Sequence, residues 1–161
     1  MSVEQSGTIT PGHRVKWVSQ NVIGDAGPLG ANLPVLGYLL SADFAATSDQ
    51  PIVLPSTMTA FQLTGIVIAN TTLSLTTAAG GFYPEAAKGG TPIVAASQVY
   101  SALTTSAKLM EATLASFGST SYFTRSILED WAIYFSLTTG QGANAYADIY
   151  LIGNDLTIYA S

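Results

Sequence analysis

Apolar and polar residues alternate along several short stretches of the chain, and a period of two is typical of β-strands with one buried face. The clearest case is Thr-Ala-Phe-Gln-Leu-Thr at residues 59–64. Turn-forming residues separate these stretches, as they do in a β-sandwich or a jelly roll. Five alternating or continuously apolar stretches are predicted as strands: 51–55, 59–68, 73–76, 131–137 and 146–152.

Glycine and proline refine this pattern. Pro51 and Pro55 bracket the first strand and place it at a sheet edge, because proline cannot donate a ladder hydrogen bond. Gly65 interrupts the second strand and predicts a bulge there. Residues 78–90 contain two Gly-Gly pairs and a proline, and they are predicted as a loop.

One segment has helical spacing. Between residues 95 and 105, apolar side chains fall at positions i, i+3 and i+4, which favours a short helix. Residues 109–114 fit a strand or a helix equally well. The chain is therefore predicted to be mainly β, with at most one short helix.

The first 45 residues differ from the rest because they contain nine glycines and prolines. Breakers at this density prevent a helix and favour an extended arm with turns. Trp17, Val22 and Ile23 in this segment are nevertheless apolar and need burial, for which a partner subunit is the expected surface. The sequence thus predicts an extended N-terminal attachment arm at 1–45 and a β-sandwich domain at 46–161.

Composition narrows the function classes. Charged residues make up 9% of the chain and hydrophobic ones 48%, which excludes the class of disordered proteins. Ten acidic and five basic residues give a net charge of −5, so nucleic acid is not an expected partner. With no cysteine, disulfides and thiolate metal sites are excluded.

The longest apolar run within the charge-free residues 50–84 is 66–69, too short for a membrane span. No secretory signal is expected at the N-terminus either.

Residues that could carry chemistry are few. His13 is the only histidine, and no Gly-x-Ser-x-Gly pattern accompanies it, so a catalytic triad is not expected. Glu129 and Asp130 are adjacent and would point to opposite faces of a strand, which argues against a shared catalytic geometry. The glycine-rich residues 80–90 lack the motif of a phosphate-binding loop. No catalytic residue, cofactor or metal site is therefore predicted.

Aromatic residues allow two interpretations. A sandwich core and a carbohydrate-binding groove both use Trp and Tyr, and the core is the favoured interpretation. The residues concerned are Trp131, Tyr134, Phe135, Tyr146, Tyr150 and Tyr159. Two further pairs, Phe82–Tyr83 and Tyr122–Phe123, lie in predicted loops and are the candidate distal contacts with a host-surface glycan.

The N-terminal segment resembles a known pattern. Residues 8–18 (Thr-Ile-Thr-Pro-Gly-His-Arg-Val-Lys-Trp-Val) and 22–27 (Val-Ile-Gly-Asp-Ala-Gly) are similar to the start of many tailed-phage fibre, spike and appendage proteins. Asn21 stands where that family often has glycine. Residues 73–81 and 88–100 also resemble small phage virion domains. The resemblance implies a virion-attachment interface that comprises Pro11, Gly12, His13, Val15, Lys16, Trp17, Val22 and Ile23.

The residues and the resemblance together predict a non-enzymatic virion structural protein, assembled in the host cytoplasm. The leading hypothesis is a trimeric short fibre or appendage subunit. Its arm would bind other virion proteins, either a tail or portal adaptor or the major capsid protein. One alternative is a capsid decoration (cement) protein that stabilises the head. A second alternative is a host-glycan-binding module. Interfaces in permanent assemblies resemble a bisected domain core, which would account for the sparse charge.

Overall fold

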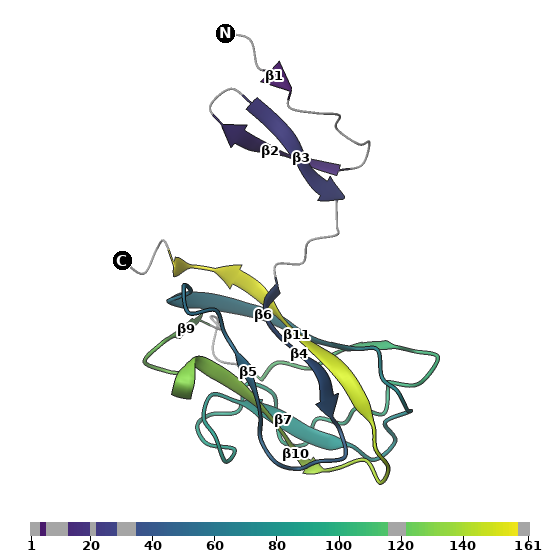
Figure 1. The fold of residues 1–161 in the computed structure, drawn as a ribbon. Helices are drawn as coiled ribbons and strands as arrows, with labels where there is room; N and C mark the ends of the chain where they lie inside the picture. The colour runs from purple at the N-terminus through teal and green to yellow at the C-terminus, as the bar shows by residue number, and fades with distance from the viewer. Residues whose placement is uncertain (1–3, 6–12, 20–21, 29–34, 116–121, 158–161) are drawn as a thin grey trace. The chain divides into compact units, whose positions relative to one another are not determined.

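The computed structural model describes residues 4–5, 13–19, 22–28, 35–115 and 122–157 (Figure 1). The chain divides into two units, Met1–Leu33 and Pro34–Ser161. In the first unit, β1 (Glu4–Gln5), β2 (His13–Ser19) and β3 (Val22–Pro28) form a sheet in the order β1-β3-β2. β3 pairs in parallel with β1 and antiparallel with β2.

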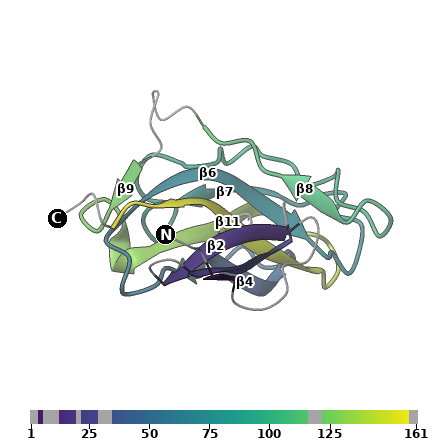
Figure 2. The ribbon, with the colours of Figure 1, turned by 90° about the horizontal axis from the view of Figure 1, so that it is seen from above.

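The second unit contains two antiparallel sheets. Sheet I has the order β4-β11-β6-β8, with β9 also pairing with β6, and sheet II has the order β5-β10-β7. β8 and β9 pair with opposite ends of β6 (Figure 2). The strands of sheet I are β4 (Val35–Asp43), β6 (Ala60–Ala69), β8 (Leu109–Glu111), β9 (Tyr122–Thr124) and β11 (Tyr146–Asp155). Those of sheet II are β5 (Gln50–Val53), β7 (Ala79–Tyr83) and β10 (Ala132–Thr139), which follows the 3-10 turn η1 (Glu129–Trp131).

The hydrophobic core lies between the two sheets. Ile149 and Leu151 of β11 and Ile66 and Ile68 of β6 are fully buried, with polar or half-exposed residues between them. Sheet II contributes Ile133, Phe135 and Leu137 of β10, which are fully buried in the same cluster, while Ala132 and Tyr134 are buried in a smaller cluster with Tyr83. Full burial of one large apolar side chain is worth about 1.5–3 kcal/mol, so these two faces hold the sheets together. The second unit is therefore a β-sandwich, which confirms the predicted fold class.

Aromatic rings fill the centre of this core. The ring of Phe135 on β10 lies 4.9 Å from that of Phe44 and 5.0 Å from that of Phe82, measured between centroids. Tyr100 approaches Phe44 edge-on at 5.2 Å. Aromatic pairs in such arrangements contribute about 0.5–1.5 kcal/mol beyond the area that they bury.

The strands predicted from strong patterns are confirmed. Residues 51–55 correspond to β5, which is one of the two edge strands of sheet II. Residues 59–68 correspond to β6, and its pairing with β11 shifts register at Gly65, where a bulge was expected. Residues 131–137 and 146–152 correspond to β10 and β11, and β11 continues beyond the predicted end at residue 152 as far as Asp155.

The helix predicted at 95–105 is absent, and turns and irregular backbone occupy this segment. Hydrogen bonds to β7 account for the difference. The amide of Gly80 donates to the carbonyl of Gln98, and the amide of Tyr100 donates to the carbonyl of Ala78. Tyr100 and Leu103 are fully buried in the core. Of the apolar residues at helical spacing, only Leu103 is buried, whereas Val99 and Ala102 are exposed, so the spacing marks no common buried face.

Two other predictions around residue 80 are wrong. Residues 73–76 form no strand, and β7 occupies part of the predicted loop 78–90. A Cβ atom at Gly80 would lie 2.3 Å from the Cα atom of Leu137, and one at Gly81 would lie 2.3 Å from the carbonyl oxygen of Val94. The two glycines therefore permit close packing of a strand, although glycine pairs usually indicate turns.

The boundary between the units lies earlier than predicted. β4 pairs with β11 along most of its length, so residues 35–43 belong to the sandwich. The second unit begins at Pro34, and not at residue 46 as expected. Among the residues that the structure describes, no helix has the length and hydrophobicity needed to cross a membrane.

Candidate functional site

Exposed apolar side chains are concentrated on the two neighbouring edge strands β4 and β5. Val35, Tyr38 and Leu40 of β4 are 48%, 60% and 56% exposed, and Val53 of β5 is 65% exposed. Together with Tyr150 of β11 they form what we call the β4/β5 face. The other exposed large apolar residues of the described chain lie on other elements: Leu73, Val99, Leu109, Tyr122, Ile127 and Tyr146.

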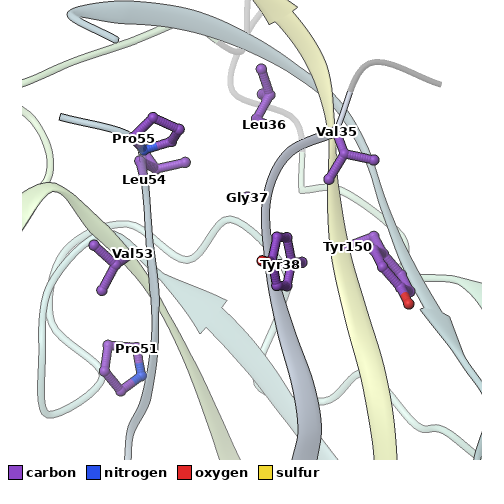
Figure 3. Close-up of a pocket in the computed structure, with 9 residues that line it drawn as sticks. All are labelled: Val35, Leu36, Gly37, Tyr38, Pro51, Val53, Leu54, Pro55 and Tyr150. Atoms are coloured by element: carbon purple, nitrogen blue, oxygen red, sulfur yellow. The ribbon is translucent and has the colours of Figure 1, made fainter. Parts of the chain in front are cut away.

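A groove of about 750 Å³ runs along this face between β4 and β5 (Figure 3). The buried residues Leu36 and Leu54 line its base together with Gly37. The exposed residues of the β4/β5 face and the two prolines of the β5 segment complete the lining: Val35, Tyr38, Pro51, Val53, Pro55 and Tyr150. None of these nine lining residues is charged.

Local sequence explains how β4 and β5 come together. A Cβ atom at Gly37 would lie 3.3 Å from Cδ2 of Leu54 and 3.5 Å from the carbonyl oxygen of Val53, so glycine lets the two strands approach closely. Tyr38 is directly opposite Tyr150 in the β4–β11 register, which places two phenol rings side by side on the outer face. β4 and β5 are the outermost strands of sheets I and II, so the groove is open to a partner.

The nearest carboxylate to this face on β11 is Asp148, and it is already hydrogen-bonded. It accepts hydrogen bonds from the amide of Ser41 at 3.0 Å and from Nδ2 of Asn70 at 2.9 Å. Burial raises the pKa of Tyr150, and the charge and hydrogen bond of Asp148 raise it further. Tyr150 therefore stays a neutral phenol at neutral pH, and the face presents apolar and aromatic surface. This chemistry suits docking of another apolar surface.

A second hollow, of about 330 Å³, lies beside the turn that follows β7. Glu85, Glu129 and residues 126–128 line it. Oε2 of Glu129 accepts a hydrogen bond from the amide of Ala86 at 2.7 Å, and a carboxylate oxygen of Asp49 accepts one from the amide of Ala87. In the described part of the chain, no group of three or more His, Cys, Asp or Glu residues could hold a metal ion. The carboxylates of Glu129 and Asp49 instead hold the turn that contains Ala87 and Lys88, two residues with a left-handed backbone conformation.

The aromatic pairs predicted as distal contacts are not exposed loops. Phe82 and Tyr83 are 0% and 2% exposed on β7, so the prediction that they form a contact loop is wrong. Tyr122 and Phe123 lie on β9, and of these two only Tyr122 is exposed. The ring of Phe123 stacks on that of Phe61, with 5.2 Å between centroids.

The buried Tyr83 hydroxyl has no hydrogen-bond partner within the described residues. Burial raises its pKa, and the charge of Asp49 raises it further. This hydroxyl does not line either hollow.

The other aromatic residues divide between core and surface. Trp131 and Phe135 belong to the main core, which confirms the core interpretation for these two, and Tyr134 is buried in a smaller cluster with Tyr83 and Ala132. Tyr146 is exposed and Tyr150 lines the groove. Tyr159 lies outside the described residues.

The predicted virion-attachment residues fall in the first unit. Pro11 and Gly12 lie outside the described residues. His13, Val15, Lys16 and Trp17 belong to β2, and Val22 and Ile23 belong to β3. Their role in attachment stays a prediction.

The β4/β5 face was not among the predicted site residues. The sequence does carry a signal for it, because Val-Leu-Gly-Tyr-Leu-Leu at residues 35–40 is apolar on both faces of a strand. One face of such a strand covers the core, and the other is left for a partner. Comparison of the chain with protein-family models, with curated proteins and with solved structures gives no match.

Proposed function

We propose that this chain is a structural subunit of a tailed-bacteriophage particle and acts by assembly, without enzymatic activity. The observation that carries the proposal is the β4/β5 face, where Tyr38, Leu40 and Val53 are each more than half exposed. Exposed apolar surface beside a groove marks a site where another macromolecule docks. The low charge content, 9% of the chain, suits a subunit whose surface is largely covered by neighbours.

In this proposal the chain is a short fibre or appendage subunit that forms a homotrimer and is located in the virion. The first unit attaches it to other virion proteins. Two features support the assignment: the resemblance of residues 8–27 to the start of phage appendage proteins, and the division of the chain after Leu33. A separate N-terminal unit can bind the particle while the sandwich projects from it.

A capsid decoration protein would use the same chemistry, so the position and the number of copies separate the two roles. The test uses virions of the phage that carries the gene. Quantitative mass spectrometry counts the copies per particle, and antibody labelling in electron micrographs locates them. A few dozen copies or fewer on the tail would support the appendage role. Hundreds of copies on the head would assign the decoration role instead.

The attachment step is tested with a shortened chain. Virions assembled with a chain that lacks residues 1–33 should contain none of it, whereas the full chain is incorporated. Absence of the full chain from purified virions would contradict the whole proposal. Incorporation of the shortened chain at the full level would contradict attachment by the first unit alone.

A further inference from the structure

We propose that residues 85–90 form a lid over a small cluster on the outer face of sheet II, and that this lid opens while the rest of the sandwich stays folded. The cluster consists of Tyr83, Ala132 and Tyr134, and it is separate from the main core. The opening is a property of the second unit and does not depend on the proposed role in a particle.

The two tyrosines of the cluster need a cover because they point away from the main core. Tyr83 and Tyr134 are directly opposite each other in the β7–β10 register, so their side chains lie on the same face of sheet II. Their neighbours along the strands, Phe82 and Phe135, are buried in the main core. The tyrosines are nevertheless only 2% and 7% exposed, and Ala86 packs against their cluster. The lid thus supplies part of their cover.

The lid is attached to neighbouring segments through two acidic side chains. The amide of Ala86 donates to Oε2 of Glu129 at 2.7 Å, and the amide of Ala87 donates to a carboxylate oxygen of Asp49. None of residues 85–90 is itself buried. A segment with few buried contacts opens at a lower free energy than the sheets beneath it.

The closed lid keeps its backbone in an unfavourable conformation. Ala87 and Lys88 have φ angles of 54° and 62°, in the left-handed region that residues other than glycine rarely adopt. Such strain persists only where surrounding contacts enforce it, and here the carboxylates of Asp49 and Glu129 do so. Opening lets both residues return to ordinary backbone conformations.

The hydroxyl of Tyr83 also favours opening. It is buried and has no hydrogen-bond partner within the described residues. A buried polar group without a partner has lost the hydrogen bonds that it makes to water. When the lid opens, water reaches this hydroxyl and restores them. The strained turn and the unpartnered phenol therefore act against the closed state, whereas the carboxylates of Asp49 and Glu129 stabilise it.

The absence of cysteine allows the opening to be measured directly. Ala132→Cys places one thiol under the lid, and Ala147→Cys places one in the main core, at sites that are 1% and 2% exposed. We expect the thiol reagent DTNB to react at least about tenfold faster with Ala132→Cys in the full chain, because only this thiol is uncovered without unfolding. Circular dichroism checks that both variants keep the fold.

Two further changes should move this rate in opposite directions. Glu129→Ala, added to Ala132→Cys, removes the acceptor for the lid amide and should speed the reaction by about tenfold. Tyr83→Phe removes the unpartnered hydroxyl and should slow the reaction about threefold. Tyr122→Phe, at an exposed site on β9, is the control for the second change and should leave the rate as it was.

A measurement on the unaltered chain repeats the test without a thiol. Tetranitromethane should nitrate Tyr83 in the folded chain and leave Tyr100 unmodified, because Tyr100 is fully buried in the main core. Mass spectrometry of peptides locates the modified residues. Equal protection of the two tyrosines would overturn the lid.

The thiol experiment can also contradict the inference. Equal rates at residues 132 and 147 would show that only global unfolding uncovers the cluster. A faster reaction at residue 132 that neither Glu129→Ala nor Tyr83→Phe alters would place the moving segment elsewhere and overturn the lid as well. Each of these results would leave the particle role standing.

Discussion

Gly140 and Gly142 lie two positions apart, after β10, in very different surroundings. A Cβ atom at Gly140 would lie 2.2 Å from the carbonyl oxygen of Ala45, whereas nothing lies within 4 Å of one at Gly142. The backbone of Ala45 cannot move easily, because Phe44 beside it is fully buried and its amide donates to the carbonyl of Ala145.

We therefore predict that Gly140→Ala lowers the free energy of unfolding by about 1–3 kcal/mol, the usual cost of overpacking. Gly142→Ala is the matched control. It should change that free energy by less than about 1 kcal/mol, in the stabilising direction, because alanine restricts the unfolded chain. Urea denaturation of both variants measures the difference. Equal effects at the two positions would contradict the close approach at Gly140.

Tyr100 is a buried phenol that contributes to the response of the sandwich to high pH. Its hydroxyl donates to the carbonyl oxygen of Gly80 at 3.1 Å in the core, and burial raises its pKa far above the usual 10.0, with a smaller contribution from Tyr83. A phenol with a raised pKa in the folded state contributes its full stability below the unfolded pKa. That contribution is lost as the pH rises above it, because the unfolded chain then releases the proton.

The free energy of unfolding should accordingly fall as the pH rises through about 10. Tyr100→Phe should cost about 1 kcal/mol at neutral pH, since it removes one hydrogen bond, and should make the fall at high pH shallower. The measurement is urea denaturation at neutral and alkaline pH, with the exposed Tyr122→Phe as control. The same alkaline slope in Tyr100→Phe as in the wild type would contradict the assignment to Tyr100.

At the scale of elements, one corner of the sandwich is held by Arg125, in the turn between β9 and η1. Its guanidinium lies 4.9 Å from the centre of the Trp131 ring and donates to the carbonyl oxygens of Ser56 and Met58. Nε1 of Trp131 donates to the carbonyl of Pro55 at 3.0 Å. One side chain thus links the β9–η1 turn to the segment that follows β5.

Arg125→Lys should lower the free energy of unfolding by about 1 kcal/mol, because lysine keeps the charge but lacks the planar group that stacks and donates in two directions. Lys108→Arg, at an exposed site, makes the reverse exchange and should have little effect. Thermal unfolding of both variants provides the comparison. A loss in Lys108→Arg as large as in Arg125→Lys would show that the stacking at Trp131 contributes nothing.

The strands also show which elements can be predicted from the sequence and which cannot. β6, β10 and β11 were predictable because each has a strong apolar pattern that burial in one core enforces. β7 was not, because its Gly80–Gly81 pair indicates a turn and serves close packing instead. The helix expected at 95–105 fails for a related reason, since partners distant in sequence decide the conformation of that segment.

At the scale of the whole molecule, the candidate site escaped prediction because it needs two strands from different sheets. The apolar residues 35–40 indicate that β4 has two faces to cover, but only the fold brings Val53 of β5 beside them. The reverse error, at Phe82 and Tyr83, arose because an exposed loop was expected where β7 enters the core. The local sequence pattern thus predicts which residues are apolar enough to need burial, and the fold determines which of them are buried.

The core residues whose burial the structure describes all belong to the second unit. A chain that begins at Pro34 should therefore fold alone, with a melting temperature within a few degrees of the full chain's. Circular dichroism during heating measures this. Failure of residues 34–161 to fold would show that the first unit contributes to the core of the sandwich.

The strand order also has a consequence for biosynthesis. β10 lies between β5 and β7, and β11 lies between β4 and β6, so each sheet receives its central strand late in the chain. Ser41 and Asp148, which are hydrogen-bonded, are 107 residues apart. While the ribosome is still translating the segment before residue 132, β8 and β9 can pair with β6, but β4, β5 and β7 have open edges because β10 and β11, with which they pair, are not yet made. Folding must therefore wait for the last strands, and chains cut short by premature termination are liable to aggregate.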